Sequence, residues 1–532
     1  MLGMMQDWPL TVDRFIDHAA RWHGAREIVS RDAAGLIART DYAGVRCDAQ
    51  RLSAALLRHG IVPGDRVATL AMNSAAHLAA WYAIAGIGAV CHTLNPRQSE
   101  DQIAFTADHA ADRLILADGQ FAALLGRVLP RCPGVERVVW LSPPEGAFAH
   151  PACELAAFVA GGDEPVAWGG FPEETAAGLC YTSGTTGDPK GVLYSHRSNV
   201  LHTLITIQPD MLGLGERDVV MPVVPMYHAN AWGLAFSAPA AGSKLVLPGP
   251  RLDGASLAAL IADEGVTFTA GVPTVWLGLL DHLEATGMRL PTLERVIVGG
   301  AALPPGVLDR FEALGIRAIH AWGMTELSPV GGVSQPVTAT AALAPEVQRG
   351  ERLKQGRVPF GIDMALVAED GTDVPHDGVT PGALRLRGPA VARGYYRHDA
   401  DALDPQGRFD TGDVATIDPR GFLQITDRAK DVIKSGGEWI SSVAIETAAA
   451  GHPAIAAAAA VAMPHARWDE RPALFVTLRP GAVEPGDLAV HLQAALPRTW
   501  LPDRITVLPA LPLGATGKVD KRALRALAAS PA

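Results

Sequence analysis

The sequence contains a run rich in glycine and hydroxyl side chains, Tyr181-Thr182-Ser183-Gly184-Thr185-Thr186-Gly187-Asp188-Pro189-Lys190-Gly191. Apolar runs at Ala176–Cys180 and Val192–Tyr194 flank it, which predicts two buried strands joined by a hairpin loop. Glycines allow close backbone approach, and amides, hydroxyls and an ammonium donate hydrogen bonds to anionic oxygens. The run is not a Walker A loop, because Asp-Pro-Lys-Gly follows Gly187. It predicts an anion-binding loop, with a plain glycine-threonine turn as the alternative.

The composition is that of a globular protein with more than one domain. The chain has 532 residues, which is too long for a single core. It is 48% hydrophobic and 19% charged, and its net charge of −11 argues against nucleic acid as a partner. The 5 cysteines include no Cys-x-x-Cys pair, which argues against a disulfide scaffold or a zinc site and fits a reducing compartment.

Two segments bear on localisation. Met1–Leu10 lacks the basic and apolar regions of a secretory signal. Val67–Leu94 has no Asp, Glu, Lys or Arg and is long enough to span a membrane. It divides, however, into a strand (Val67–Met72), a helix (Ala75–Ile87) and a strand (Ala89–Leu94), which favours a buried β-α-β unit. We expect no transmembrane segment and a cytoplasmic protein.

Short apolar runs alternate with helical segments, which predicts a layered α/β domain. Further strands are expected at Arg113–Ala117, Val138–Leu141, Val219–Val224, Lys244–Leu247, Thr267–Ala270, Val296–Gly299 and Ala318–His320. Ligands gather at the carboxyl ends of such strands. Three loops follow expected strands and are candidates for the site: Pro225–His228, Gly299–Ala302 and Ala321–Glu326.

The pattern of expected secondary structure changes in the last third of the chain. Glycine-punctuated β segments at Asp363–Ala368, Gly382–Arg387 and Phe422–Thr426 predict a β-rich subdomain over about 356–426, which closes an N-terminal domain of residues 1–426. A polar junction at 427–430 follows and is the expected domain boundary. The pattern of residues 431–532 then predicts a small α+β domain with a core of its own.

The glycine-rich run resembles the phosphate-binding signature of adenylate-forming enzymes, which include acyl-CoA synthetases, carrier-loading adenylation domains and beetle luciferases. Four more motifs follow in that family's order: Trp322-Gly323-Met324-Thr325-Glu326, Phe409-Asp410-Thr411-Gly412-Asp413, Asp427-Arg428-Ala429-Lys430-Asp431 and Gly514-Ala515-Thr516-Gly517-Lys518. The resemblance extends from Leu10 to Leu527 and is nearest to fatty-acyl-CoA synthetases and methylmercaptopropionate-CoA ligases. It implies ATP, Mg²⁺ and coenzyme A (CoA) as cofactor and co-substrates.

The resemblance assigns a nucleotide site. An aromatic plane, a hydroxyl and a carboxylate suit base stacking, phosphate contact and Mg²⁺, and the resemblance gives these roles to Trp322, Thr325 and Glu326. Trp322 departs from the commoner tyrosine. Asp413 and Arg428 match the residues that hold the ribose. The other expected nucleotide contacts are Thr182, Ser183, Gly184, Thr185, Thr186, Gly187, Lys190, Gly300, Ala301, Ala302, His320, Ala321, Gly323 and Met324, with Thr186 also at the metal.

Lys518 matches the lysine that bridges the substrate carboxylate and the α-phosphate. A carboxylate that attacks a phosphate brings two anions together, so a positioned ammonium and Mg²⁺ neutralise the developing charge. Lys518, Thr325 and Glu326 are therefore the expected catalytic residues. Lys521 is the nearby lysine for which no such role is expected.

Lys434-Ser435-Gly436-Gly437-Glu438-Trp439 contains two adjacent glycines beside a lysine. A plain surface turn is one interpretation. The resemblance implies instead that this stretch lines the pantetheine tunnel after the C-terminal domain rotates about Lys430. The expected CoA and hinge residues are Lys430, Asp431, Lys434, Ser435, Gly436, Gly437, Glu438, Trp439 and Glu470.

The acyl pocket is expected around Tyr227, His228 and Trp232, with Gly299, Gly300 and Pro329. A general base is one role for His228; a pocket wall is favoured, because a carboxylate is already ionised at neutral pH. Trp232 resembles the gate tryptophan of fatty-acyl-CoA synthetases. The same His-x-Asn-x-Trp pattern occurs in methylmercaptopropionate-CoA ligases, so it does not fix chain length.

The sequence thus predicts an acyl-CoA ligase that acts on medium- to long-chain fatty acids, with 3-methylmercaptopropionate or another short acid as the close alternative. A stand-alone carrier-loading enzyme, a luciferase-like oxygenase and a non-catalytic nucleotide sensor are weaker alternatives. A homodimer is an expectation from the resemblance alone.

Overall fold

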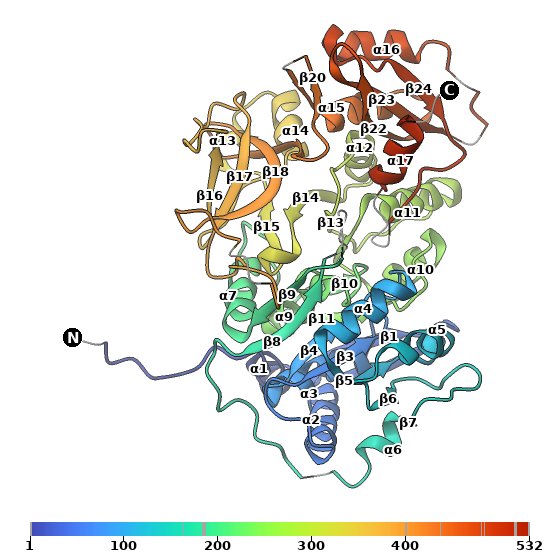
Figure 1. The fold of residues 1–532 in the computed structure, drawn as a ribbon. Coiled ribbons are helices and arrows are strands. Elements are labelled where there is room, and N and C mark those ends of the chain that lie inside the picture. The colour runs from blue at the N-terminus through green and yellow to red at the C-terminus, as the bar shows by residue number, and fades with distance from the viewer. Residues whose placement is uncertain are drawn as a thin grey trace.

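The computed structural model describes residues 3–162, 164–182, 188–398, 402–436, 438–479, 481–483, 485–514 and 519–529, and for residues 438–439 the backbone only. Four sheets organise this part of the chain. Figure 1 shows the blue and green elements as one body, with the orange four-stranded sheet and the red C-terminal unit at the end far from α2 (Tyr42–Arg58) and α6 (Leu155–Val159). The predicted α/β fold is confirmed.

The first large sheet has the order β7-β6-β5-β3-β4-β8-β9. Its strands are β7 (Ala152–Glu154), β6 (Arg137–Trp140), β5 (Asp112–Ala117), β3 (Arg66–Leu70), β4 (Val90–Thr93), β8 (Ala176–Tyr181) and β9 (Gly191–Ser195). With α3 (Ala75–Gly86) between them, β3 and β4 pair in parallel, which confirms the β-α-β prediction for Val67–Leu94. In the described part of the chain no helix is both long and apolar enough to cross a membrane.

The second large sheet has the order β15-β14-β13-β12-β10-β11-β1-β2. Its strands are β15 (Val330–Val333), β14 (Arg317–Gly323), β13 (Arg295–Val298), β12 (Phe268–Gly271), β10 (Val219–Pro222), β11 (Lys244–Leu247), β1 (Glu27–Arg31) and β2 (Ile37–Asp41). The neighbours β10, β12, β13 and β14 are parallel, so their carboxyl ends share one edge. The segments predicted to follow these strands therefore meet at that edge.

A helix without charged residues joins the two large sheets. All sides of α3 are buried, as expected for a helix that is apolar all round, and its side chains share a core with strands of both sheets. Trp81 packs edge-on against Phe236 of α9 (Leu234–Ala241), with ring centroids 4.7 Å apart. Burial of each such aromatic side chain stabilises the fold by about 1.5–3 kcal/mol.

The remaining helices of this body cover the sheets or connect their strands. They are α1 (Asp13–Trp22), α4 (Glu100–Ala110), α5 (Ala122–Val128), α7 (His196–Thr206), α8 (Ala229–Trp232), α10 (Gly254–Glu264), α11 (Pro273–Thr286), α12 (Pro305–Ala313), α13 (Thr338–Ala341) and α14 (Pro345–Leu353). Several begin with the expected cap: the Ser99 hydroxyl accepts from the Gln102 amide at the start of α4, and Gln102 bonds back to the Ser99 amide.

The third sheet is antiparallel and has the order β16-β17-β18-β19. Its strands are β16 (Asp363–Val367), β17 (Gly382–Arg387), β18 (Phe409–Ile417) and β19 (Leu423–Arg428). The motif Phe409–Asp413 forms the beginning of β18. The strand bulges there: Ala383 pairs with Val414 and Arg385 with Asp410, and Gly412 has a φ of 68°.

The C-terminal unit is an α+β structure, as predicted. Its sheet contains β20 (Ile433–Ser435), β21 (Glu438–Ile440), β22 (Ile455–His465), β23 (Asp469–Leu478) and β24 (Arg504–Val507), covered by α15 (Ser442–Ala450), α16 (Leu488–Ala495) and α17 (Lys521–Ala529). β19 runs through Arg428 before the chain crosses to this unit. The domain limits and the hinge at 427–430 stay predictions.

Candidate active site

The signature run begins and ends on paired strands. β8 and β9 are antiparallel, with Tyr181 opposite Gly191, and the Thr182 amide donates to the Lys190 carbonyl at 2.9 Å. The hairpin prediction is confirmed for these flanks. The predicted phosphate contacts Ser183, Gly184, Thr185, Thr186 and Gly187 lie outside the described residues.

Glu326 presents a buried carboxylate near this hairpin. It lies in a 3₁₀ turn (Thr325–Leu327) and is 6% exposed. Its Oε1 accepts a hydrogen bond from the Tyr395 hydroxyl at 2.7 Å. The carbonyl of Thr325 accepts another from Tyr194 of β9, also at 2.7 Å. Two tyrosines therefore fix the turn, one through its backbone and the other through the carboxylate.

Glu326 is the described carboxylate that best fits a divalent cation. Among the described residues no Lys, Arg or His forms an ion pair with it, so this buried carboxylate lacks an ion-pair partner there. Within the same part of the chain, no three His, Cys, Asp or Glu side chains gather around a metal position. Mg²⁺ needs no such group, because it commonly takes one or two carboxylates together with substrate phosphates.

Asp413 and Arg428 meet across β18 and β19. They are opposite each other in the ladder, and Arg428 Nε lies 2.6 Å from Asp413 Oδ1. Asp413 is 1% exposed, whereas the Arg428 side chain is 42% exposed. A carboxylate acceptor beside a guanidinium donor suits a diol, whose hydroxyls both donate and accept. The structure therefore brings together the two residues predicted for ribose.

The expected loop at Ala321–Glu326 is only partly a loop. Ala321, Trp322 and Gly323 belong to β14, which pairs antiparallel with β15. The loop prediction is wrong for these three residues, because the chain turns back after them and β15 pairs with them as the edge strand of the sheet. Trp322 packs in the core of the β-rich subdomain at 8% exposure, close to Gly331. Met324 and Thr325 follow the strand and are partly exposed.

His320 is a buried, neutral member of this edge. Its Nδ1 bonds to the Leu353 carbonyl at 2.8 Å, and burial lowers the pKa of His320 below its usual value. Gly300, Ala301 and Ala302 follow β13, and the last two are exposed. The predicted nucleotide contacts of β13 and β14 therefore lie at one edge, as the parallel order requires.

Trp232 lies against the glycines predicted for the acyl pocket. A β-carbon at Gly299 would be 3.0 Å from the Trp232 ring, and one at Gly300 would be 3.7 Å away. Tyr227 is buried, which raises the pKa of its hydroxyl, and His228 is half-buried at the start of α8. Pro329 is buried, and its carbonyl accepts from the Met324 amide at 3.0 Å. The structure thus places the predicted pocket residues beside the nucleotide residues.

The backbone that carries Trp232 is left-handed. Ala229, Asn230, Ala231 and Trp232 have φ values of 45°, 56°, 53° and 56°. Each non-glycine residue in this region costs roughly 1–2 kcal/mol, so other contacts must hold the turn. Asn230 supplies one: its Oδ1 accepts from Trp81 Nε1 at 3.1 Å. This hydrogen bond fixes the backbone two residues before Trp232 and so helps to position its indole.

Several predicted CoA residues lie on strands of the C-terminal unit: Lys434 and Ser435 on β20, and Glu470 on β23. β20 pairs with β21, and the Lys434 amide donates to Glu470 Oε2 at 2.8 Å. Gly436 has a φ of 58°, and a β-carbon there would be 2.7 Å from the Trp468 ring. Gly437 and the side chains of Glu438 and Trp439 lie outside the description, as does Lys518. The geometry therefore brings Lys434, Gly436 and Glu470 together.

Two family models match this chain. Residues 15–396 match the family of AMP-binding enzymes, and residues 444–518 match the AMP-binding enzyme C-terminal domain. The chain belongs to the AMP-binding enzyme family. The predicted resemblance to adenylate-forming enzymes is confirmed.

Three relatives match this AMP-binding enzyme over nearly the full length of both chains. A 3-methylmercaptopropionyl-CoA ligase of Ruegeria lacuscaerulensis is 45% identical, covering 99% of this chain and 98% of the relative. A medium-chain-fatty-acid–CoA ligase of Ectopseudomonas oleovorans is 44% identical, covering 99% and 97%. A long-chain-fatty-acid–CoA ligase of Thermus thermophilus is 44% identical, covering 98% and 96%.

Solved structures share the fold. An anthranilate CoA ligase in complex with anthranoyl-AMP superposes with a TM-score of 0.86 at 23% identity, covering 98% of this chain and 99% of that one. ATP-bound MatB of Rhodopseudomonas palustris gives 0.82 at 24% identity, covering 97% and 99%. At this identity the likeness supports the AMP-binding enzyme fold alone.

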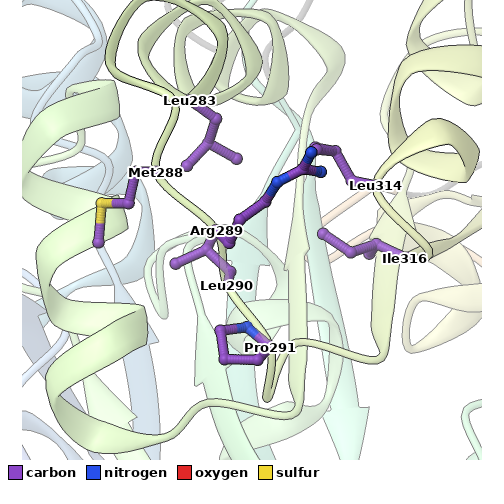
Figure 2. Close-up of a pocket in the computed structure, with 7 residues that line it drawn as sticks. All are labelled: Leu283, Met288, Arg289, Leu290, Pro291, Leu314 and Ile316. Carbon is purple, nitrogen blue, oxygen red and sulfur yellow. The ribbon is translucent and has the colours of Figure 1, made fainter.

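A cavity of about 220 Å³ lies away from the site of this AMP-binding enzyme. Figure 2 shows its lining residues, which are Leu283, Met288, Arg289, Leu290, Pro291, Leu314 and Ile316. They come from the end of α11, the end of α12 and the segments before β13 and β14. These segments precede the amino ends of the strands, whereas the candidate residues follow the carboxyl ends. The cavity contains none of the predicted site residues.

Several residues that shape the candidate site were not predicted from the sequence. Asn230 stands inside the His-x-Asn-x-Trp pattern, so the pattern itself could have indicated it. Tyr194 ends the apolar run after the signature loop, and Tyr395 lies in none of the motifs. Arg525, which donates to the Lys430 carbonyl at 3.0 Å, carries no signal beyond its place on an amphipathic helix.

Proposed function

We propose that the protein is an ATP-dependent ligase that joins a carboxylic acid to CoA through an acyl-adenylate. One observation carries this proposal: the chain matches enzymes named as CoA ligases of carboxylic acids over nearly its whole length at 44–45% identity. The geometry supports it, because the buried carboxylate and the signature hairpin lie in one body, and the carboxylate–guanidinium pair lies on the four-stranded sheet that shares a core with Trp322 and Leu327 of that body.

The reaction has two half-reactions. An oxygen of the acid's carboxylate bonds to the α-phosphorus of ATP while the bond to the bridging oxygen breaks, and pyrophosphate leaves with that electron pair. The CoA sulfur then bonds to the acyl carbon, AMP leaves with the electron pair of the broken acyl–oxygen bond, and solvent takes the thiol proton. No general base is needed for the first step, because the carboxylate is already ionised.

The chain's own residues divide these tasks. Trp322, Asp413 and Arg428 bind adenine and ribose, and Thr182 and Lys190 flank the loop that binds the phosphates. Glu326 and Thr186 hold Mg²⁺, which when bound neutralises negative charge on the phosphates. Lys518 places an ammonium between the carboxylate and the α-phosphate. Lys434, Gly436 and Glu470 meet at the surface proposed for CoA.

The proposed acids are medium- to long-chain fatty acids. One observation favours a second candidate, a short acid such as 3-methylmercaptopropionate. The indole of Trp232 lies directly against Gly299 and Gly300, where an acyl tail would pass. A fixed indole at this position shortens the pocket, whereas a mobile one would admit longer chains.

A substrate panel tests the function and distinguishes the two candidates. Saturated acids from acetate to stearate, with 3-methylmercaptopropionate, are assayed for AMP release that requires CoA. The ligase proposal predicts release with CoA alone and no carrier protein. Release of pyrophosphate without any CoA-dependent AMP would instead indicate a carrier-loading enzyme. Absence of acid-dependent pyrophosphate with every acid would contradict enzymatic activity and leave a nucleotide sensor.

Two further proposals concern the protein's state. We infer a cytoplasmic location from the sequence and a homodimer from the family resemblance. Fractionation of the native host tests the first, and light scattering during size exclusion tests the second.

A further inference from the structure

Tyr395 occupies the junction between the Glu326 turn and the signature hairpin. Its segment leaves β17 and passes beside β9 before β18 begins. The Ala392 amide donates to the Glu326 carbonyl at 2.7 Å, and the Tyr396 amide donates to the Gly191 carbonyl at 2.8 Å. The backbone around Tyr395 is therefore tied to both elements.

The hydroxyl of Tyr395 orients the Glu326 carboxylate. It donates to Oε1 at 2.7 Å, and an ionised carboxylate can only accept. A phenol is protonated at neutral pH, so it acts as the donor. A hydrogen bond to a charged acceptor is stronger than one between neutral groups. Among the described residues, the other carboxylate oxygen accepts no hydrogen bond.

The ring of Tyr395 contacts a second candidate residue. Lys190 Nζ lies 5.0 Å from the ring centroid, within range of a cation–π interaction. Phe409 at the start of β18 packs edge-on against the same ring, with centroids 6.2 Å apart. One side chain thus contacts both the carboxylate predicted for Mg²⁺ and the ammonium beside the predicted phosphate loop.

We propose that Tyr395 is a positioning residue for adenylation: its hydroxyl orients Glu326 toward Mg²⁺, and its ring orients Lys190 toward the phosphates. The inference rests on the proposed function. Tyr395 touches no reacting atom and acts only through these two groups. Side chains that orient metal ligands in this way usually change metal affinity or activity by about 10–100-fold when removed.

The test measures ATP binding by calorimetry, with Mg²⁺ and with EDTA, for the wild type, Tyr395→Phe and Tyr396→Phe. The first variant loses the hydroxyl and keeps the ring; the second makes the same change on the neighbouring tyrosine. In Tyr395→Phe we expect the gain in affinity from Mg²⁺ to fall about tenfold, with Mg²⁺-free affinity within about twofold of wild type. The Mg²⁺ concentration that gives half of the maximal adenylation rate should rise by the same factor. Excess Mg²⁺ should restore the adenylation rate. Tyr396→Phe should match the wild type.

A double-mutant cycle covers the case in which Tyr395→Phe is merely less stable. If the tyrosine acts through Glu326, adding Tyr395→Phe to Glu326→Gln changes the Mg²⁺ dependence no further. Tyr395→Leu also removes the ring, and should weaken Mg²⁺-free ATP binding by a further factor of about two to five.

Three results would overturn the inference: an unchanged Mg²⁺ dependence in Tyr395→Phe, equal losses with and without Mg²⁺, or additive effects in the cycle. Each can occur while the wild type is fully active, so it leaves the proposed function intact. A wild-type chain that binds no ATP would instead contradict the proposed function, and this inference with it.

Discussion

The two regions that supply the candidate site are held in different ways. In the N-terminal body, Glu326 and the Thr325 carbonyl are fixed by hydrogen bonds from Tyr395 and Tyr194, and both anchored groups lie beside packed sheets. In the C-terminal unit, α17 reaches the junction through one charged side chain: Arg525, which is 32% exposed, pairs with Asp431. Buried contacts are costly to break, whereas ion pairs with an exposed partner contribute about 0–1 kcal/mol. The body is therefore built for one geometry, and this attachment of the C-terminal unit can be exchanged at little cost, which fits the proposed rotation.

The largest expected effect separates the two half-reactions at Lys518. Lys518→Ala should slow adenylation by about a thousandfold or more, because the developing charge between carboxylate and phosphate loses its ammonium. The same variant should still convert preformed acyl-AMP and CoA to thioester at nearly the wild-type rate. Pyrophosphate release and thioester formation from synthetic acyl-AMP measure the two steps separately.

Lys521 supplies the control for that experiment. Its ammonium donates to the Ser442 hydroxyl at 2.6 Å and lies beside Glu446, so it stabilises the packing of α17 on α15. Lys521→Ala should lower the melting temperature and leave adenylation within about tenfold of wild type. An equal loss of both half-reactions in Lys518→Ala would contradict the assigned role.

Gly437→Pro should produce the opposite pattern with a somewhat smaller effect. Proline fixes φ and adds a ring where a thin backbone is proposed to border CoA. Thioester formation from acyl-AMP should fall by about a hundredfold, with pyrophosphate release preserved. Normal thioester synthesis by this variant would remove the stretch Lys434–Trp439 from the proposed CoA surface.

Sequence patterns predicted the fold well where a long apolar run is divided into strand and helix lengths by polar residues and glycines. The segment Val67–Leu94 formed the expected strand, helix and strand, because its apolar residues leave only buried positions. The strands β14 and β18 were missed or shortened for the opposite reason. Gly323 stood in an expected loop and Gly412 in a motif with no expected strand. Both lie in strands, where a neighbouring backbone comes close to Gly323 and the strand bulges at Gly412.

Site residues divide in the same way. Asp413, Arg428 and Glu326 could be predicted, since each stands in a short motif with a chemical purpose. Tyr395 could not, because its role depends on a contact 69 residues away in sequence. The left-handed turn at Ala229–Trp232 could not be predicted either, since alanine and tryptophan do not favour positive φ and the contacts that hold it, such as that of Asn230 with Trp81, are tertiary.

Trp232→Ala tests whether the N-terminal body alone determines the specificity for the acid. Removal of the indole opens the space beside Gly299 and Gly300. We expect the ratio of kcat/KM for decanoate over butyrate to rise about tenfold, a moderate discrimination for an apolar pocket. Gly437→Pro should leave this ratio unchanged in the adenylation assay. A ratio that moves in Gly437→Pro and not in Trp232→Ala would place acid selection in the C-terminal unit.

The smallest effect concerns the junction itself. Arg525 donates to the Lys430 carbonyl at 3.0 Å and pairs with Asp431, so it favours the arrangement seen in this structure. An ion pair with one partly exposed partner contributes up to about 1 kcal/mol, which corresponds to at most about a fivefold shift between two arrangements. Arg525→Ala should therefore change the ratio of adenylation to thioester formation by about two- to fivefold, with the melting temperature nearly constant. Arg522, an exposed arginine on the same helix, provides the control, since Arg522→Ala removes equal charge without touching the junction. If both variants shift the ratio equally, net charge and not the Arg525 contact governs the balance, and the low-cost attachment inferred for the C-terminal unit would need another source.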